Sequence, residues 1–547
     1  MNEQPIRPLL DIPAGVTRRK TLLMLSSTAV LVACGGDDKS PSSGPTPTPT
    51  SSPTPTSGPA WYGYGRNAQH TGQSAIASQN LNRVAWSTPV DTLPQYTPSG
   101  ALLTHYGSPV ISQFNTVVLP VKTTANGSSL ETGGHFRIEG RNGANGLLIW
   151  TRNSDYMSPP HNWFPPYNLQ LTQDGKLYAP GAGGKLLVRP NPDQASATFA
   201  EVVFYGSTVY ASNPTAFRDT VFINTPLTAD DAGNIFFGFM VTGTNPAGLV
   251  SGIARVGADG SGSWIGAAAA AADNTIAKPA MNCAPALSND GSTLYIAVNR
   301  PRVSGVTQTG MLLALDSTTL AVKARRDLID PNTGSGARVS DDGSGAPVIA
   351  PDGKVFYGVL ETTFPAHNAR GWMLQFDADL NPAGVPGSFG WDVSPSIVPA
   401  SIVPSYTGTS AYLIATKYNN YNGVGTGDGL NRLAVLDPNN SQPDPVIPSV
   451  NVMREVFTIL GPTLDGGSAT ARREWCINTF AVDVERKSIL ANNEDGMMYR
   501  WDLTTNTLSQ GIRLTTGIGQ AYTPTLVGAD GGVYAINNAT LYAIRAT

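Results

Sequence analysis

The sequence predicts an all-β fold of repeated four-stranded antiparallel sheets, and three observations lead to this prediction. The 547 residues include 58 glycines and 43 prolines, too many turn formers for a helical bundle. The 41% of hydrophobic residues is enough to build a core. An apolar strand followed by a tight Asp-Gly or Asn-Gly turn returns at intervals of roughly 59 residues, without a helical period.

Charge and cysteine content exclude several classes of protein. The net charge of −4 and a pI near 5.8 leave no basic excess to neutralise phosphates, so we expect no nucleic-acid partner. Three cysteines cannot staple a disulfide scaffold, and no Cys-x-x-Cys-His haem site or paired Cys-x-x-Cys zinc site is present.

Residues 1–33 are predicted to be a lipoprotein signal peptide. A basic start (Arg18, Arg19, Lys20) precedes an apolar stretch, 21–33, that is too short to span a membrane. Residues 31–35, Leu-Val-Ala-Cys-Gly, resemble the bacterial lipobox, which implies lipidation of Cys34 and cleavage before it. The alternative is a stray cysteine in an ordinary cleaved signal. Residues 17–22 also resemble a twin-arginine signal, which leaves the export route open.

Residues 34–60 are predicted to be a Pro/Thr/Ser-rich tether, because such a stretch has nothing to bury and favours polyproline II. No later segment reaches 18 uncharged apolar residues, so we expect a body that is anchored by lipid and does not span. Gly35 stands where an aspartate retains some lipoproteins in the inner membrane. The expected location is therefore the bacterial cell envelope, with the outer membrane favoured and its side left open.

Residues 61–547 are predicted to form one eight-bladed β-propeller of four-stranded blades. The repeat has copies near residues 109, 169, 226, 285, 347, 404, 479 and 524, each expected to supply four strands. The eighth copy ends at 541–544 after three strands, and residues 84–86, Val-Ala-Trp, are expected to supply the fourth and close the ring. The alternative, two stacked sandwiches, explains neither the period nor the split last repeat.

Two segments carry a family resemblance. Residues 61–72, Trp-Tyr-Gly-Tyr-Gly-Arg-Asn-Ala-Gln-His-Thr-Gly, resemble the opening of proteins with pyrroloquinoline-quinone-like (PQQ-like) propeller repeats. Residues 141–150 resemble their tryptophan-docking turn, although most blades lack the tryptophan. The resemblance covers 61–547 as architecture. The family includes quinone-dependent alcohol dehydrogenases and cofactor-free scaffolds, such as the propeller lipoprotein of the outer-membrane barrel-assembly machine.

The dehydrogenases of that family use a calcium-bound quinone, an aspartate base and usually two adjacent cysteines. This chain has no adjacent cysteines, and Cys283 and Cys476 lie three predicted blades apart, beyond the ~7 Å Cα separation of a disulfide. The five histidines are scattered, with no metal-binding spacing. We therefore expect neither PQQ nor calcium, no metal, and no assignable catalytic residue.

The long connections predict a binding face. They join second to third strands at 121–135, 241–250, 299–310, 360–371 and 416–430, and link blades at 151–166, 327–345 and 456–475. In a propeller both classes emerge on one face, where binding residues concentrate. Aromatic faces and guanidinium groups suit protein partners and flat or carboxylated small molecules. The candidate binding residues are His135, His161, Trp163, Arg300, His367, Arg370, Trp372, Tyr418 and Arg473. The alternative for Trp163 and Trp372 is that they only pack the loops.

The sequence therefore favours a membrane-anchored, extracytoplasmic binding or scaffold propeller. The alternatives are a quinone-dependent dehydrogenase or another propeller enzyme, a lyase or hydrolase.

Overall fold

The computed structural model describes residues 57–96, 102, 106–123, 135–159, 167–341, 343, 345–362, 370–418, 427–475, 479–516 and 524–547. The chain divides into two units, 1–54 and 55–547, and all described residues belong to the second. The predicted signal peptide, Cys34 and nearly all of the predicted tether lie outside the described residues, so these boundaries stay predictions.

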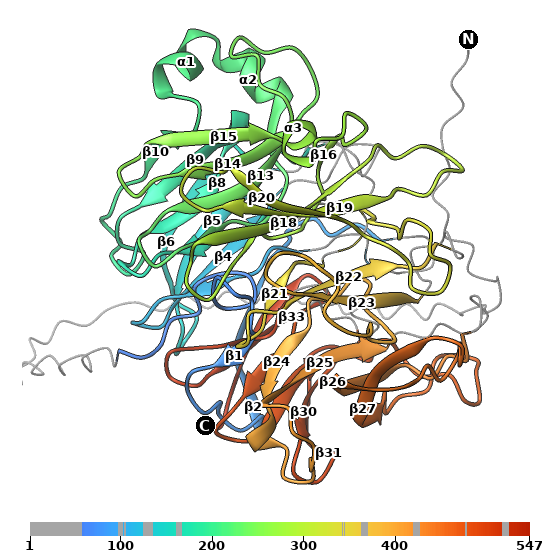
Figure 1. Ribbon diagram of the computed structural model, residues 1–547. Coiled ribbons are helices and arrows are strands. Elements are labelled where there is room, and N and C mark those ends of the chain that lie inside the picture. Colours follow the sequence, from blue (N-terminus) through green and yellow to red (C-terminus); the bar gives the residue numbers. More distant parts are fainter. Residues whose placement is uncertain are drawn as a thin grey trace, which may run out of the picture. The chain divides into compact units, whose positions relative to one another are not determined.

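Eight antiparallel sheets follow one another along the described chain and form the blades of a propeller (Figure 1). The first strand of each blade is short and buried, and later strands pair outward in order. Blade 1 consists of β3 (Val110–Ile111), β4 (Thr116–Lys122), β5 (Phe136–Asn142) and β6 (Leu148–Ser154), and blade 2 of β7 (Gln170–Leu171), β8 (Leu177–Pro180), β9 (Lys185–Arg189) and β10 (Ala200–Val203). Blade 3 consists of β11 (Val221–Ile223), β12 (Thr228–Ala229), β13 (Ile235–Val241), β14 (Gly252–Val256) and β15 (Gly262–Gly266). Blade 4 consists of β16 (Lys278–Pro279), β17 (Ala286–Leu287), β18 (Thr293–Asn299), β19 (Gly310–Asp316) and β20 (Val322–Asp327).

The second half of the ring continues the pattern with one irregular blade. Blade 5 consists of β21 (Val348–Ile349), β22 (Val355–Leu360) and β23 (Gly371–Phe376), and blade 6 of β24 (Ser396–Pro399), β25 (Tyr412–Tyr418), β26 (Arg432–Pro443) and β27 (Asn451–Leu460). Blade 7 consists of β28 (Ala481–Asp483), β29 (Ser488–Asn492), β30 (Met497–Asp502) and β31 (Thr507–Arg513). Blade 8 consists of β32 (Leu526–Val527), β33 (Val533–Asn537) and β34 (Thr540–Arg545) together with β2 (Arg83–Pro89). The predicted all-β, eight-bladed propeller is confirmed.

The last blade is closed by the N-terminal strand, as predicted from residues 84–86. β2 pairs antiparallel with β34, with Val84 opposite Ile544 and Thr88 opposite Leu541. The Trp86 indole donates to the Gly143 carbonyl of blade 1 at 2.9 Å, which ties the last blade to the first. Trp150 repeats this docking one blade further on, donating to the Pro192 carbonyl at 2.6 Å.

Two predicted details are wrong. The first strand of blade 6 is β24 (Ser396–Pro399), not a segment near residue 404, because the chain turns into a 3-10 helix, η2 (Ala400–Ile402), after Pro399. Blade 5 has three strands in the described chain, not four. The long β26–β27 hairpin of blade 6 leans over the outer edge of blade 5. The Met453 amide of the hairpin donates to the Pro386 carbonyl at 2.8 Å, and the Gln375 side chain of blade 5 donates to the Pro438 carbonyl at 3.0 Å.

Short helices punctuate the ring. α1 (Ser207–Ser212) and α2 (Pro214–Thr220) form an insertion between blades 2 and 3, at the top of Figure 1. Asn213 caps α2 by accepting from the Ala216 amide. α3 (Ala267–Ala271) follows β15, and the 3-10 helix η1 (Ala182–Gly184) precedes β9. None of the helices within the described ranges has the length and apolarity that a membrane crossing requires.

Candidate functional site

The two ends of the ring are built differently. Turns between first and second strands are short in most blades, as at 172–176, 288–292 and 350–354. Second-to-third connections are long at 123–135, 242–251, 300–309, 361–370 and 419–431, as the sequence predicted. We call these ends the short-turn face and the long-loop face.

The segment 57–79, which we call the N-terminal cap, closes the axis on the short-turn face. Its backbone bonds to the inner ends of blades 1, 2, 4, 5, 6, 7 and 8. The amide of Trp61 donates to Ile111, and the carbonyls of Tyr62, Ala68 and Gly72 accept from amides of blades 2, 4 and 7. β1 (Gln73–Ser74) pairs parallel with β28. The cap uses the backbone groups that short inner strands leave free.

His70 anchors the cap at the centre. Its Nδ1 donates to the Pro347 carbonyl at 2.8 Å, and the edge of its ring meets Tyr64 at 5.3 Å between centroids. Burial lowers the pKa of His70 to about 4, so the imidazole is neutral at pH 7. Tyr64 in turn bonds Ser394 of blade 6 through their hydroxyls, 2.9 Å apart.

A buried carboxylate organises the polar groups between blades 4 and 5. Asp341 accepts from Lys278 at 2.6 Å, from Asn299 at 2.8 Å and from Gln308 at 2.9 Å. The Met281 amide also donates to this carboxylate, at 3.1 Å, and a carboxylate with four donors has the geometry of a structural hub.

Three of the predicted binding residues come together on the long-loop side of blades 5 and 6. Arg370 lies over the rings of Trp372 at 4.7 Å and Phe389 at 5.1 Å, and Phe389 stacks on Tyr418 at 4.9 Å. All are buried, with Trp372 wholly enclosed. This packing agrees with the alternative interpretation of Trp372, and the binding role of these residues stays a prediction.

An ion cluster that the sequence did not reveal sits beneath Arg370. Its guanidinium forms a bidentate pair with Asp444, at 2.9 and 2.6 Å, at the tip of the β26–β27 hairpin. Glu361 lies 3.1 Å from Arg370 Nε, but its carboxylate has no aligned hydrogen bond from any described residue. Desolvation by burial raises the pKa of Glu361 to about 7, and the Asp330 and Asp444 carboxylates add to this rise while Arg370 opposes it.

The other candidates within the described residues are not brought to this cluster. Arg300 pairs with Asp273 at 2.7 Å on blade 4, and Arg473 pairs with Asp465 at 3.2 Å after blade 6. His135 is exposed beside β5. His161, Trp163 and His367 lie outside the described residues.

The described residues offer no ligand set for the calcium ion of the quinone site that the family resemblance implies. Among the described residues no group of three or more His, Cys, Asp or Glu side chains could hold a metal ion. Cys283 is buried, and desolvation raises its pKa to about 12, so the thiol stays protonated and unreactive. Cys476 lies outside the described residues.

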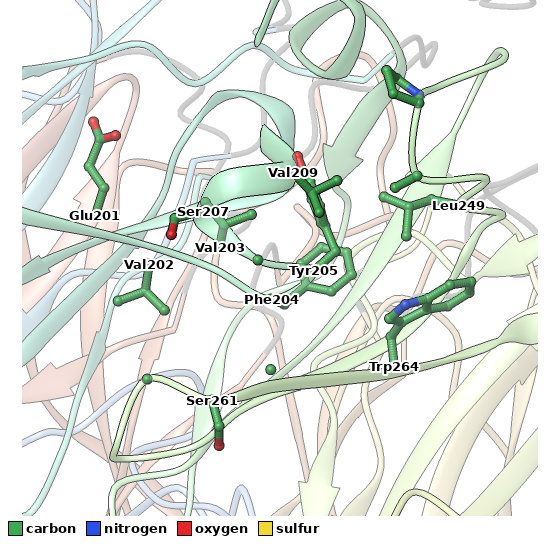
Figure 2. A pocket seen from close by; sticks show the side chains of 15 residues that line it. Glu201, Val202, Val203, Phe204, Tyr205, Ser207, Val209, Leu249, Ser261 and Trp264 are labelled. Carbon is green, nitrogen blue, oxygen red and sulfur yellow. The ribbon is translucent and has the colours of Figure 1, made fainter. Parts of the chain in front are cut away.

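An open groove of about 800 Å³ lies at the rim between blades 2 and 3 (Figure 2). Phe204, Tyr205 and Val209 line one side and Leu249 and Trp264 the other. The sequence analysis did not single out these residues. Two signals could have found them: the aromatic-rich insertion at 204–220 and the glycine-flanked tryptophan at 262–266.

The architecture defines the class as an eight-bladed β-propeller, and comparisons with known proteins add likeness in fold only. No protein-family model and no curated protein matches the sequence. Among solved structures, the quinohemoprotein alcohol dehydrogenase ADHIIG of Pseudomonas putida HK5 matches with a TM-score of 0.46 and 12% identity, over 88% of this chain and 76% of that one. BamB of Moraxella catarrhalis matches with a TM-score of 0.33 and 10% identity, over 85% of this chain and 99% of that one. Sqt1 of Saccharomyces cerevisiae matches with a TM-score of 0.42 and 9% identity, over 86% of this chain and 99% of that one. None of these likenesses bears on function.

Proposed function

We propose that this chain is a binding propeller of the bacterial cell envelope, anchored by lipid on Cys34, whose long-loop face receives a protein or small-molecule partner. The difference between the two faces carries the proposal. One end of the axis is covered by the N-terminal cap and trimmed turns, while the other presents long loops from five blades. Loops of this kind on a rigid ring are where binding residues concentrate.

The entry point of the chain supports this orientation. The Gly58 amide donates to the Gln113 carbonyl at 2.8 Å, and Gln113 lies in the first short turn of blade 1. The chain thus enters the ring on the short-turn face. A polyproline tether over 34–56 would extend to roughly 70 Å. A lipid anchor at its start would therefore connect to the ring on the short-turn side and would leave the long-loop face free of the tether.

The anchor is tested with Cys34→Ser expressed as the full chain in a Gram-negative bacterium. We expect the wild type in the membrane fraction with a mass increase on the N-terminal peptide, and Cys34→Ser in the soluble fraction with an unchanged melting temperature. Cys283→Ala is the matched control and should stay membrane-bound, because this thiol is buried inside blade 4. Membrane retention of Cys34→Ser would place the anchor elsewhere and contradict this part of the proposal.

The binding face is tested separately on exposed loop residues. Val303 and Val306 are 52% and 63% exposed on the long loop of blade 4. Val303→Glu with Val306→Glu should reduce the recovery of proteins cross-linked to the full chain in membranes at least fivefold. Asn289→Glu with Ser292→Glu, on the exposed short turn of the same blade, should leave recovery unchanged. Equal loss from both pairs would refute a face-specific partner.

A further inference from the structure

The outermost strand of blade 3 is the least defended sheet edge of this propeller. Exposed edges are normally protected by charged side chains, since free backbone groups invite pairing with another chain. β15, with the sequence Gly-Ser-Trp-Ile-Gly, carries no charge. Every other exposed outermost strand in the described chain carries at least one exposed charged residue: Arg83 on β2, Arg152 on β6, Glu201 on β10, Lys323 on β20, Arg454 on β27 and Arg513 on β31. The outer strand of blade 5, β23, is also uncharged, but it is buried along its length.

The free edge of β15 directs specific backbone groups outward. The register with β14 pairs Ala254 with Trp264, and the Gly257 amide donates to the Ser261 carbonyl while the Ala267 amide donates to Ser251. In an antiparallel ladder, alternate residues exchange hydrogen bonds and those between them point away. Trp264 therefore turns its N–H and C=O away from β14.

The groove next to this edge fits apolar side chains. The Trp264 indole, 36% exposed, forms one wall and meets Phe239 at 6.0 Å, and Val209 on α1 is 37% exposed. The only charged residue lining the groove, Glu201, is already paired with Lys185 at 2.8 Å. Burying apolar side chains here would thus leave no unpaired charge.

We propose that β15 accepts an added strand from another protein, an extended segment with bulky apolar side chains at alternate positions. Its backbone would pair with the outward groups of Trp264, and every second side chain would enter the groove beside the indole. This surface lies on the rim and borders the long-loop face through Leu249 of the 242–251 connection, but the proposal concerns the free edge of β15 and does not depend on the other long loops.

A second copy of this chain fits the groove poorly. If β15 paired with its own copy about Trp264, the residues at the groove positions on either side would be Gly262 and Gly266. Glycines supply no side chain, so the only bulky side chain that a copy would add on this face is its own Trp264, directly opposite the indole that already forms the wall. A foreign segment with apolar residues two apart fills the groove.

The test uses the full chain purified in detergent and a phage library of random 12-residue peptides as the probe. We expect enriched peptides with apolar residues at i and i+2. A synthetic enriched peptide should slow hydrogen exchange in the fragment that contains Trp264 by at least tenfold at one or two amides.

Two variants at one position separate the backbone from the side chain. Trp264→Ala should weaken the peptide at least tenfold by removing the indole wall. Trp264→Pro also removes the outward N–H, without breaking a bond to β14, and should weaken it at least tenfold further. Lys323→Ala on β20 is the matched control and should not change binding. Peptides without the alternating pattern, binding that both variants retain, or a dimer of the full chain that Trp264→Pro abolishes would each overturn the proposal.

Discussion

Protonation of His70 should destabilise the folded chain at the N-terminal cap, and comparison of the wild type with His70→Asn measures this loss of stability. His70 is 1% exposed, its Nδ1 is bonded to Pro347, and no described residue bonds its Nε2. The backbone of His70 is in the left-handed region, with φ of 58°, which asparagine tolerates. The substitution therefore removes the titrating group and keeps the turn.

The sign and size of the effect follow from the pKa of His70. The folded value is about 4, against 6.5 for an unperturbed histidine, because burial disfavours the imidazolium. Between these pH values the unfolded chain binds a proton that the folded chain does not, so stability falls as the pH falls. The difference corresponds to about 3 kcal/mol, most of it lost between pH 6.5 and 4.5.

The assay is urea unfolding followed by tryptophan fluorescence at pH 7.5, 6.0, 5.0 and 4.5. The free energy of unfolding of the wild type, relative to His70→Asn, should fall by roughly 2 to 3 kcal/mol across this range. A constant offset between the proteins only reports the loss of the Pro347 bond. A difference that stays level with pH, within about 0.5 kcal/mol, would refute the reasoning.

The remaining predictions concern ring closure and the ion cluster. Trp86→Ala removes the bond to Gly143 and the ring contact with Tyr534, 5.9 Å away. It should cost about 3 kcal/mol in urea unfolding, and a chain beginning after residue 95 should aggregate in light scattering; unchanged melting of that chain would contradict closure by β2. Glu361→Gln removes a carboxyl whose pKa is raised to about 7, and the wild type loses stability as the pH rises from 4.5 through 7. The free energy of unfolding of the variant, relative to that of the wild type, should rise by about 2 kcal/mol between pH 5 and 8. A relative free energy that is larger at pH 5 than at pH 8 would contradict a raised pKa of Glu361.

The ring could be predicted because local signals repeat. Where a proline-containing strand meets an Asp-Gly or Asn-Gly turn, as at 285–291 and 347–353, the predicted and observed inner strands coincide. Blade 6 has no such turn, and the prediction followed Pro404, several residues beyond β24. The strand near Trp86 was predictable because the last repeat was visibly one strand short.

The ion cluster and the groove could not be predicted in this way. Arg370 and Asp444 are 74 residues apart, and their pairing depends on a hairpin that leans across a neighbouring three-stranded blade. No local pattern encodes that lean. The groove likewise combines an insertion after blade 2 with the outer strand of blade 3, and only the ring brings them together.

The contacts of the N-terminal cap also constrain the order in which the chain can fold. Gly72 accepts from Val482, and the Gln79 amide donates to Gly531, so residues made first bond to residues made more than 400 positions later. Contacts of such sequence separation form slowly, because a long loop must close before they stabilise anything. The cap can bond to the early blades as soon as they form, but Gly72, Gln79 and β2 have to wait for their partners in blades 7 and 8. Completion of the ring is therefore a step that follows synthesis of blade 8, and a polypeptide that stops before blade 8 leaves β2 without its partner strand.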